Sequence, residues 1–358
     1  MTIKIRSIRA RAVDVPLEYP VKTAVGLVAS SPLVLIDVET TDGVIGSAYL
    51  FAYIKPALKP LAETVDALAP IVIGQPLAPI EIDRLIEQRL RLVGHTGLFR
   101  MASAGIDMAI WDALAKQQKQ PLYALLGAQA RPIRTYDSHS MDGIALATKR
   151  AAQAAERGFT GLKTKIGYAN VEEDVAVIRA IRAEAGDTMG IMADYNQSLD
   201  VPEAIRRGRV LDDENLIWLE EPTIERDYAG HARIGHAIRT PIQMGENWLG
   251  VTEMNWAIDA QACAFGMLDI MKIGGVTGWQ RAASLALLKG LPLSSHLFQE
   301  FSAHLLAATP TAHWLERLDI AGPILEPLLT FKDGFAHLAE QPGAGIVWRE
   351  DAIAKYSV

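Results

Sequence analysis

The first 125 residues alternate between strand-like and helix-like patterns of apolar positions, which is typical of an α+β domain. An Asp42-Gly43 turn between two strand-like runs predicts a β-hairpin. The expected strands are Ile3–Val15, Leu33–Thr40 and Val44–Tyr49, and the expected helices are Ala57–Leu68, Ile82–Leu92 and Leu98–Gln118.

From about Arg134 the pattern changes to short apolar runs that alternate with amphipathic stretches. Strict alternation of strand and helix predicts βαβ units and a parallel sheet. At least seven such runs in fewer than about 190 residues favour a closed (β/α) barrel over an open sheet. The clearest strand-like runs are Gly161–Ile166, Gly190–Asp194, Leu216–Glu220, Pro241–Gly245, Met267–Met271 and Leu291–Ser295.

The last 35 or so residues contain turn signals and one further strand-like run, Ile346–Trp348. We expect three parts: residues 1–125 as the α+β domain, residues 126–322 as the barrel, and residues 323–358 as a segment that returns to the first domain.

Composition narrows the functional classes. Half of the 358 residues are apolar, so the chain can bury a large core. The formal net charge of −7 gives no electrostatic reason to bind nucleic acid or an acidic membrane surface. A single cysteine, Cys263, excludes an intrachain disulfide and fits a reducing compartment. Without an apolar run typical of a signal peptide or a membrane span, we expect a cytoplasmic protein.

Almost every barrel strand ends in an acid or a base, which is the most informative feature of the sequence. Successive members are separated by one βα unit, from 20 residues (296 to 316) to 29 residues (165 to 194). This repeat predicts that they share the C-terminal rim of the barrel, where barrel active sites lie. The set is Lys163, Lys165, Asp194, Glu220, Glu246, Asp269, His296 and Glu316.

Three of these residues, Asp194, Glu220 and Glu246, come from consecutive strands. Converging carboxylates would repel one another without a cation, and oxygen ligands with room for substrate favour Mg²⁺. Each acid alone would more readily be a helix cap or a surface ion pair. Three in register at strand ends favour a metal site.

Two further strand ends carry candidate bases. Lys163 and Lys165 point the same way from one strand, and mutual repulsion between two ammonium groups should lower the pKa of one of them. Asp269 could hydrogen-bond His296 and fix its tautomer. A solvated lysine pair and a core histidine are the plainer interpretations. In a closed barrel, however, the two strands lie on opposite sides, as inversion at one carbon requires.

At this point the whole chain resembles the enolase superfamily, and within it the mandelate racemase group. The resemblance implies a modified TIM barrel, (β/α)7β, with an N-terminal α+β capping domain that carries a substrate-specificity lid. The matching stretches are Pro20–Val25, Thr164–Gly167 with Lys163, Asp194–Ser198, Trp218–Pro222, Met244–Trp248, Asp269–Gly275, Ser294–Phe298 and His313–Glu316.

The resemblance also implies roles for the rim residues in a racemase. Asp194, Glu220 and Glu246 would bind Mg²⁺, which holds the substrate carboxylate. Lys165 would remove the α-proton from the (S) enantiomer, and His296, supported by Asp269, from the (R) enantiomer. Lys163 would neutralise carboxylate charge, and a protonated Glu316 would donate a hydrogen bond to the enolate. Asn196 and Ser138 match supporting polar contacts.

The resemblance implies that the substrate is mandelate or a close aryl 2-hydroxy acid, and that the protein is a homo-oligomer, by family an octamer. Lys22 and Leu27 depart from the family pattern in the lid. The residues that match the apolar cavity for the aromatic ring are Val21, Val25, Val28, Phe51, Tyr53, Leu297 and Leu318.

Three other functions remain open from the sequence. An acid-sugar dehydratase of the same superfamily would use the same metal and bases, but its lid should be polar. A Schiff-base aldolase would use Lys165 or Lys163 as nucleophile and would leave the three carboxylates unexplained. A non-catalytic assembly protein is disfavoured because no candidate metal ligand is missing.

Overall fold

The computed structural model describes residues 2–358 and begins with a three-stranded antiparallel sheet. The central strand presents six consecutive buried residues, Ser31–Ile36, because helices pack against it. The strands, in spatial order, are β1 (Ile5–Lys22), β2 (Leu27–Thr40) and β3 (Ile45–Phe51), and the helices that follow are α1 (Lys55–Val72), α2 (Pro79–Arg89), α3 (Gly97–Gln117) and α4 (Leu122–Leu125).

Helix α3 lies directly on this sheet. A Cβ atom added at Gly105 would sit 2.6 Å from Ile36 and 2.8 Å from Leu50, so the glycine permits the close approach of helix and sheet. All three predicted helices and all three predicted strands of this region are present.

Strands β1 and β2 extend beyond their predicted ends into a long hairpin. The apolar alternation of β1 is interrupted by prolines, and its register with β2 shifts between Pro16 and Val21. Proline is tolerated there because β1 is an edge strand. Thr23 closes the hairpin by accepting hydrogen bonds from the backbone N–H groups of Val25 (3.1 Å) and Gly26 (3.0 Å).

The predicted barrel is confirmed, with eight parallel strands and the order (β/α)7β. The ring closes because β11 pairs with β4, and the backbone N–H of Ser295 donates to the carbonyl of Trp314 (3.0 Å). The strands are β4 (Ile133–Ser138), β5 (Gly161–Lys165), β6 (Gly190–Asp194), β7 (Leu216–Glu220), β8 (Ile242–Met244), β9 (Phe265–Asp269), β10 (Leu293–His296) and β11 (Leu315–Arg317). The helices between them are α5 (Gly143–Glu156), α6 (Val171–Ala185), α7 (Val201–Leu211), α8 (Tyr228–Ala237), α9 (Val251–Asp259), α10 (Ile270–Ile273), α11 (Gly275–Lys289) and α12 (Gln299–Ala307).

A layer of large buried side chains fills the barrel interior beneath the rim. Each member stands two residues before a residue of the rim. Because side chains alternate along a strand, the layer residue and the rim residue both point toward the barrel axis. Trp218, for example, lies below Glu220 and donates its indole N–H to that carboxylate (2.9 Å). The layer consists of Tyr136, Met192, Trp218, Met267 and Trp314.

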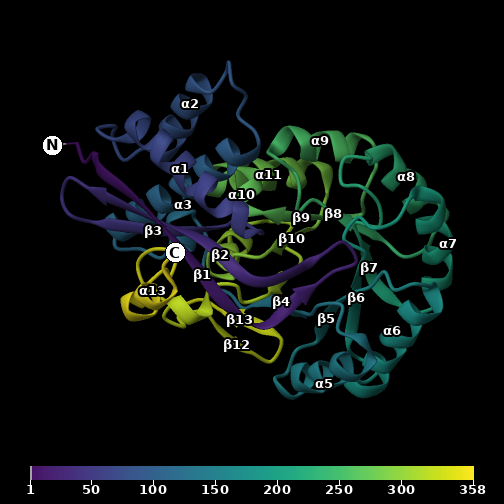
Figure 1. Ribbon diagram of the computed structural model, residues 1–358. Helices are drawn as coiled ribbons and strands as arrows, with labels where there is room; N and C mark the ends of the chain where they lie inside the picture. The colour runs from purple at the N-terminus through teal and green to yellow at the C-terminus, as the bar shows by residue number, and fades with distance from the viewer. Residues whose placement is uncertain (1) are drawn as a thin grey trace.

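The C-terminal segment contacts both parts of the molecule (Figure 1). A short hairpin pairs with β4 of the barrel, whereas Ser357 forms a bridge with Val13 of β1. The predicted strand Ile346–Trp348 is wrong, because only an isolated bridge joins Trp348 to Leu325. Its elements are η1 (Gly322–Ile324), β12 (Thr330–Lys332), β13 (Phe335–His337) and α13 (Glu350–Tyr356). Within residues 2–358, no helix is both long and apolar enough to span a membrane.

Candidate active site

A cavity of about 580 Å³ lies between the C-terminal rim of the barrel and the β1–β2 hairpin. Its polar wall includes Lys165, Glu246, His296 and Glu316, which come from four different barrel strands or the loops directly after them. The periodic spacing of acids and bases therefore predicted correctly that these side chains meet on one rim.

Lys163 is fully buried below this wall and is held by acids. Its Nζ lies 2.5 Å from Glu220 Oε1, 3.1 Å from Glu316 Oε1 and 3.9 Å from Asp194 Oδ2. Burial alone would lower the pKa of Lys163, but the negative charges of Glu220 and Glu316 raise it well above the ordinary value. Lys163 is therefore a fixed positive charge in this arrangement.

Lys165 lines the cavity and donates to Asp194 Oδ2 at 2.6 Å. The expected lowering of a lysine pKa is wrong for this arrangement. Burial and the Lys163 charge act in that direction, but the Asp194 carboxylate outweighs them and raises the pKa of Lys165. The sequence placed the two ammonium groups together correctly but could not show that each has a carboxylate partner.

His296 has the expected acidic partner. Its Nδ1 lies 2.8 Å from Asp269 Oδ2, and its Nε2 lies 3.3 Å from Glu246 Oε2. Asp269 is itself fixed, because Oδ1 accepts from the backbone N–H groups of Met271 and Lys272. Burial would lower the pKa of His296, but the charge of Glu246 and the hydrogen bond with Asp269 raise it.

Glu316 is buried between basic groups, and the expectation of a protonated carboxyl is wrong for this arrangement. Burial would raise the pKa of Glu316, but the charges of Lys163 and His296, together with the hydrogen bond from the Leu297 N–H (2.9 Å), lower it to about 2. Glu316 is therefore ionised near neutral pH.

The three predicted metal ligands do not converge in this arrangement. Asp194 bonds Lys165, Glu220 bonds Lys163, and Glu246 faces His296. Across residues 2–358, no three His, Cys, Asp or Glu side chains lie close enough together to bind one metal ion. The reason is electrostatic, because each basic neighbour draws one carboxylate toward itself.

The chemistry of the three acids still fits a hard divalent cation. Burial raises the pKa of Glu220, and the charge of Lys163 lowers it. The charges of Asp194 and Glu246 raise it further, so the pKa reaches about 7. Carboxylates that disfavour each other's charge are suitable ligands for a divalent ion. The buried Oδ1 of Asn196 also lacks a hydrogen-bond partner within the described chain, while its amide N–H₂ donates to Asp194 (2.9 Å).

The predicted apolar residues all line the cavity, and so does Asn196, but Ser138 does not. Ser138 lies at the end of β4, where its buried Oγ has no partner among residues 2–358. Sequence reasoning missed further apolar residues, which lie on the extended hairpin, on or near α1 and α3, and just after β11. A longer prediction of β1 and β2 would have identified those of the hairpin. The missed apolar residues are Leu17, Leu27, Ala52, Ile54, Ala57, Leu98, Met101 and Ile320.

A second polar group in the cavity wall was also missed. Lys272 Nζ donates to Asn247 Oδ1 (2.6 Å), and Asn247 in turn donates to the buried Glu221 (2.8 Å). The Lys272 ammonium lies 4.6 Å from the centre of the Tyr53 ring. The only signal in the sequence was position, because each of these residues lies within three residues of a predicted site residue.

Comparisons with known proteins agree with this fold. Residues 5–127 match the family model described as the mandelate racemase / muconate lactonizing enzyme N-terminal domain, and residues 147–352 match the enolase C-terminal domain-like model. The L-talarate/galactarate dehydratase of Salmonella typhimurium is 31% identical over 94% of this chain and 87% of its own length.

Two solved structures are similar over the whole chain. A Bradyrhizobium enolase, complexed with magnesium and mandelic acid, is 43% identical with a TM-score of 0.96, and the match covers 100% of this chain and 99% of that one. An enolase from an alpha proteobacterium (BAL199), with bound magnesium, is 38% identical with a TM-score of 0.97 and complete coverage of both chains. The chain belongs to the enolase superfamily, with the N-terminal domain of the mandelate racemase / muconate lactonizing enzyme type.

Proposed function

We propose that this protein is a Mg²⁺-dependent racemase of aryl 2-hydroxy acids, with mandelate as the simplest substrate. One observation carries the proposal: a lysine and a histidine from distant barrel strands, Lys165 on β5 and His296 on β10, line the same cavity. Two bases that reach one carbon from opposite faces can remove its proton on one side and return a proton on the other.

Each base has the support that proton transfer requires. His296 Nε2 faces the cavity side, while Asp269 binds Nδ1, keeps the ring oriented and stabilises the protonated imidazole. Lys165 Nζ is held by Asp194, so its position in the cavity is fixed before substrate arrives. In our assignment Lys165 acts on the (S) enantiomer and His296 on the (R) enantiomer.

Asp194, Glu220 and Glu246 would hold Mg²⁺, which when bound supplies positive charge to the substrate carboxylate. Around that carboxylate, the buried ammonium of Lys163 adds a second positive charge. Glu316 lies 3.1 Å from Lys163 Nζ and would hold that ammonium in position beside the substrate carboxylate.

The other wall of the cavity supports an aryl group on the substrate. Val21, Val28, Phe51 and Leu318 contribute apolar side chains to the lining of the same cavity. Burial of a phenyl ring against such a surface stabilises binding by about 25 cal/mol for each Å² removed from water. The Bradyrhizobium enolase with mandelic acid provides independent support for the same ligand class.

Acid-sugar dehydration is the second candidate, and Lys272 is the observation that favours it. This ammonium in the cavity wall contacts an amide oxygen and has no carboxylate within 4 Å among the described residues, so it could receive a polar substrate group. The dehydratase of Salmonella typhimurium adds support. The apolar hairpin argues against a polyhydroxylated chain. A Schiff-base aldolase is a weaker candidate, because it gives no role to the carboxylates of Asp194, Glu220 and Glu246.

Polarimetry with purified protein, Mg²⁺ and (R)-mandelate tests the proposal. We expect optical rotation to decay to zero, with no change in ultraviolet absorbance from a keto acid. A stable rotation with mandelate, together with keto-acid release from galactarate, would instead establish the dehydratase. The homo-oligomeric state remains a prediction.

A further inference from the structure

The turn after His296 has an unusual backbone. Leu297 (φ 50°) and Phe298 (φ 46°) are consecutive residues in the left-handed region, which is unfavourable for side chains larger than glycine. Such a conformation persists only where surrounding contacts hold it. This turn connects His296 to α12, and its Leu297 N–H donates to Glu316 (2.9 Å), so its geometry affects two rim residues together.

A hydrogen bond from the N-terminal domain reaches this turn. Tyr49 on β3 is 1% exposed, and its hydroxyl donates to Glu300 Oε2 at 2.6 Å. The Tyr49 ring also packs against Phe298, with ring centres 5.1 Å apart. One side chain of the capping sheet therefore contacts both a left-handed residue of the turn and the first turn of the helix that follows.

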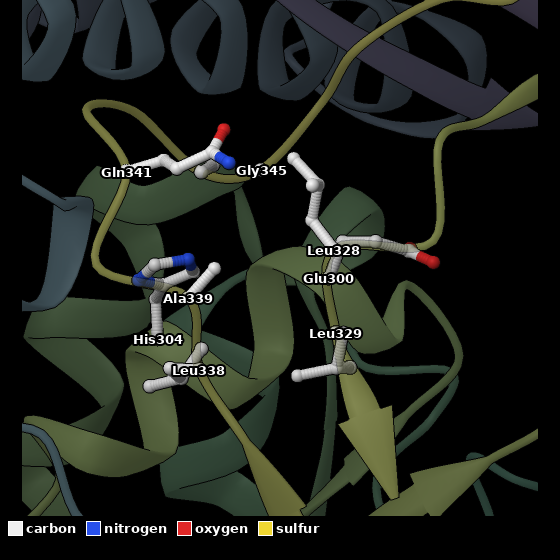
Figure 2. Close-up of a pocket in the computed structure, with 9 residues that line it drawn as sticks. Glu300, His304, Leu328, Leu329, Leu338, Ala339, Gln341 and Gly345 are labelled. Carbon is white, nitrogen blue, oxygen red and sulfur yellow. The ribbon is translucent and has the colours of Figure 1, made fainter.

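Glu300 depends on Tyr49 for its strongest hydrogen bond. Its other side-chain donor, the Gln299 amide, is farther away at 3.3 Å. Burial and the charge of Asp319 raise the pKa of Glu300, so the carboxylate needs good donors to stay ionised. Glu300 and His304, both on α12, line a small cavity (Figure 2). With a volume of about 10 Å³, this cavity has room for about one water molecule and for no larger ligand.

We propose that Tyr49 and Glu300 form a positioning pair that holds the Leu297–Phe298 turn, and with it His296 and Glu316, in the geometry that proton transfer requires. Neither residue lines the substrate cavity, so the pair acts through the turn and not by contact with substrate. The proposal rests on the racemase function for its catalytic consequence. Its structural consequence, an ordered turn, is independent of that function.

Tyr49→Phe tests the pair because it removes only the hydroxyl and keeps the ring against Phe298. We expect kcat for racemisation to fall at least ten-fold, with KM changed by less than about two-fold, because the substrate cavity is untouched. Exchange of the α-proton of (R)-mandelate in D₂O should fall further than that of (S)-mandelate, because His296 precedes the turn directly. Glu300→Gln should act similarly, and Tyr49→Phe/Glu300→Gln should add little to either single change.

Thr309→Val is the matched control. It removes a buried hydroxyl that accepts from the Trp279 indole (3.0 Å) and donates to the Leu305 carbonyl (2.8 Å), just beyond the end of α12 that lies away from the turn. This variant should unfold at a lower temperature but keep the wild-type kcat and the wild-type ratio of (R) to (S) exchange. A Thr309→Val variant with the same (R)-selective loss would overturn the proposal, because the effect would then be a general consequence of lower stability.

Hydrogen–deuterium exchange of the backbone gives a readout that needs no activity. Peptides that cover residues 297–302 should exchange faster in Tyr49→Phe than in wild-type protein, and at the wild-type rate in Thr309→Val. Unchanged exchange in this segment, or wild-type kcat in Tyr49→Phe, would overturn the positioning role. If the wild-type protein racemises no acid, the proposed function fails, and the exchange measurement still decides whether the pair holds the turn.

Discussion

Gly161→Ala is expected to destabilise the barrel because the first position of β5 has no room for a methyl group. An added Cβ would lie 2.9 Å from two ring atoms of Trp314 and 3.1 Å from Tyr136 Cβ. The Trp314 ring cannot easily move, because it is fully buried and the Arg134 guanidinium covers its face at 3.7 Å. This strand, β5, carries Lys163 and Lys165, so a shift of the strand would also displace these two lysines.

The magnitude follows from two opposing effects. Overpacking a filled core costs about 1–3 kcal/mol, whereas replacing glycine by alanine in a strand gains about 0.5–1 kcal/mol. The net loss for Gly161→Ala is therefore between about 0 and 2.5 kcal/mol, and the midpoints of the two ranges give about 1.3 kcal/mol. With an unfolding entropy of about 2.1 cal/mol/K for each residue, a chain of this length shifts its Tm by about 1.3 °C for each kcal/mol. We expect a Tm that is lower by about 1–3 °C.

Gly235→Ala is the matched control for this prediction. Gly235 is exposed on α8, and an added Cβ would meet nothing closer than 3.7 Å. Alanine in a helix should stabilise by up to about 1 kcal/mol, so the Tm should rise by about 1 °C. Calorimetry of both variants under identical conditions provides the comparison. A Gly161→Ala protein as stable as Gly235→Ala would refute the close packing of the barrel interior.

Three further predictions concern the metal, pH and the cavity. Removal of divalent ions with EDTA should abolish racemisation and added Mg²⁺ should restore it, and full activity of metal-free protein would contradict the role of the carboxylates. Burial raises the pKa of Asp107 from 3.8 to about 7, so its contribution to stability is full below pH 3.8 and lost as pH rises through 7. Urea unfolding should therefore show Asp107→Asn gaining stability relative to wild type between about pH 4 and pH 7, with little further change above pH 8, and a difference that stays constant from pH 4 to pH 7 would contradict this. Val25→Ser should raise KM for mandelate about five-fold through the loss of about 1 kcal/mol of apolar contact, whereas Ile45→Ser, outside the cavity, should not.

The sequence was sufficient to predict the barrel and the membership of its rim. An interior residue such as Trp218 stands two positions before a strand-end residue such as Glu220. The alternation of side chains along a strand therefore shows which residues point into the barrel and which reach its rim. The hairpin was predicted too short, because Pro16 and Pro20 interrupt the apolar alternation although backbone pairing continues past them.

Charge states could not be predicted from the sequence because they depend on side-chain partners. Two lysines two residues apart predicted a lowered pKa for one of them. In the structure, however, the Nζ of Lys163 lies 2.5 Å from Glu220 and the Nζ of Lys165 lies 2.6 Å from Asp194. Glu316 was expected to be protonated, and the same Lys163 lowers its pKa instead. Alternation along a strand predicts the direction in which a side chain points. The carboxylate that pairs with each lysine comes from another strand, and the sequence alone does not identify it.

The central claim is that Lys165 and His296 act on opposite faces of one carbon, and proton exchange in D₂O measured by ¹H NMR tests it most directly. With Mg²⁺ present, Lys165→Ala should exchange the α-proton of (R)-mandelate but not that of (S)-mandelate. His296→Asn should show the reverse, and neither variant should racemise. If either variant exchanged both enantiomers at the wild-type rate, the two-base assignment would be contradicted.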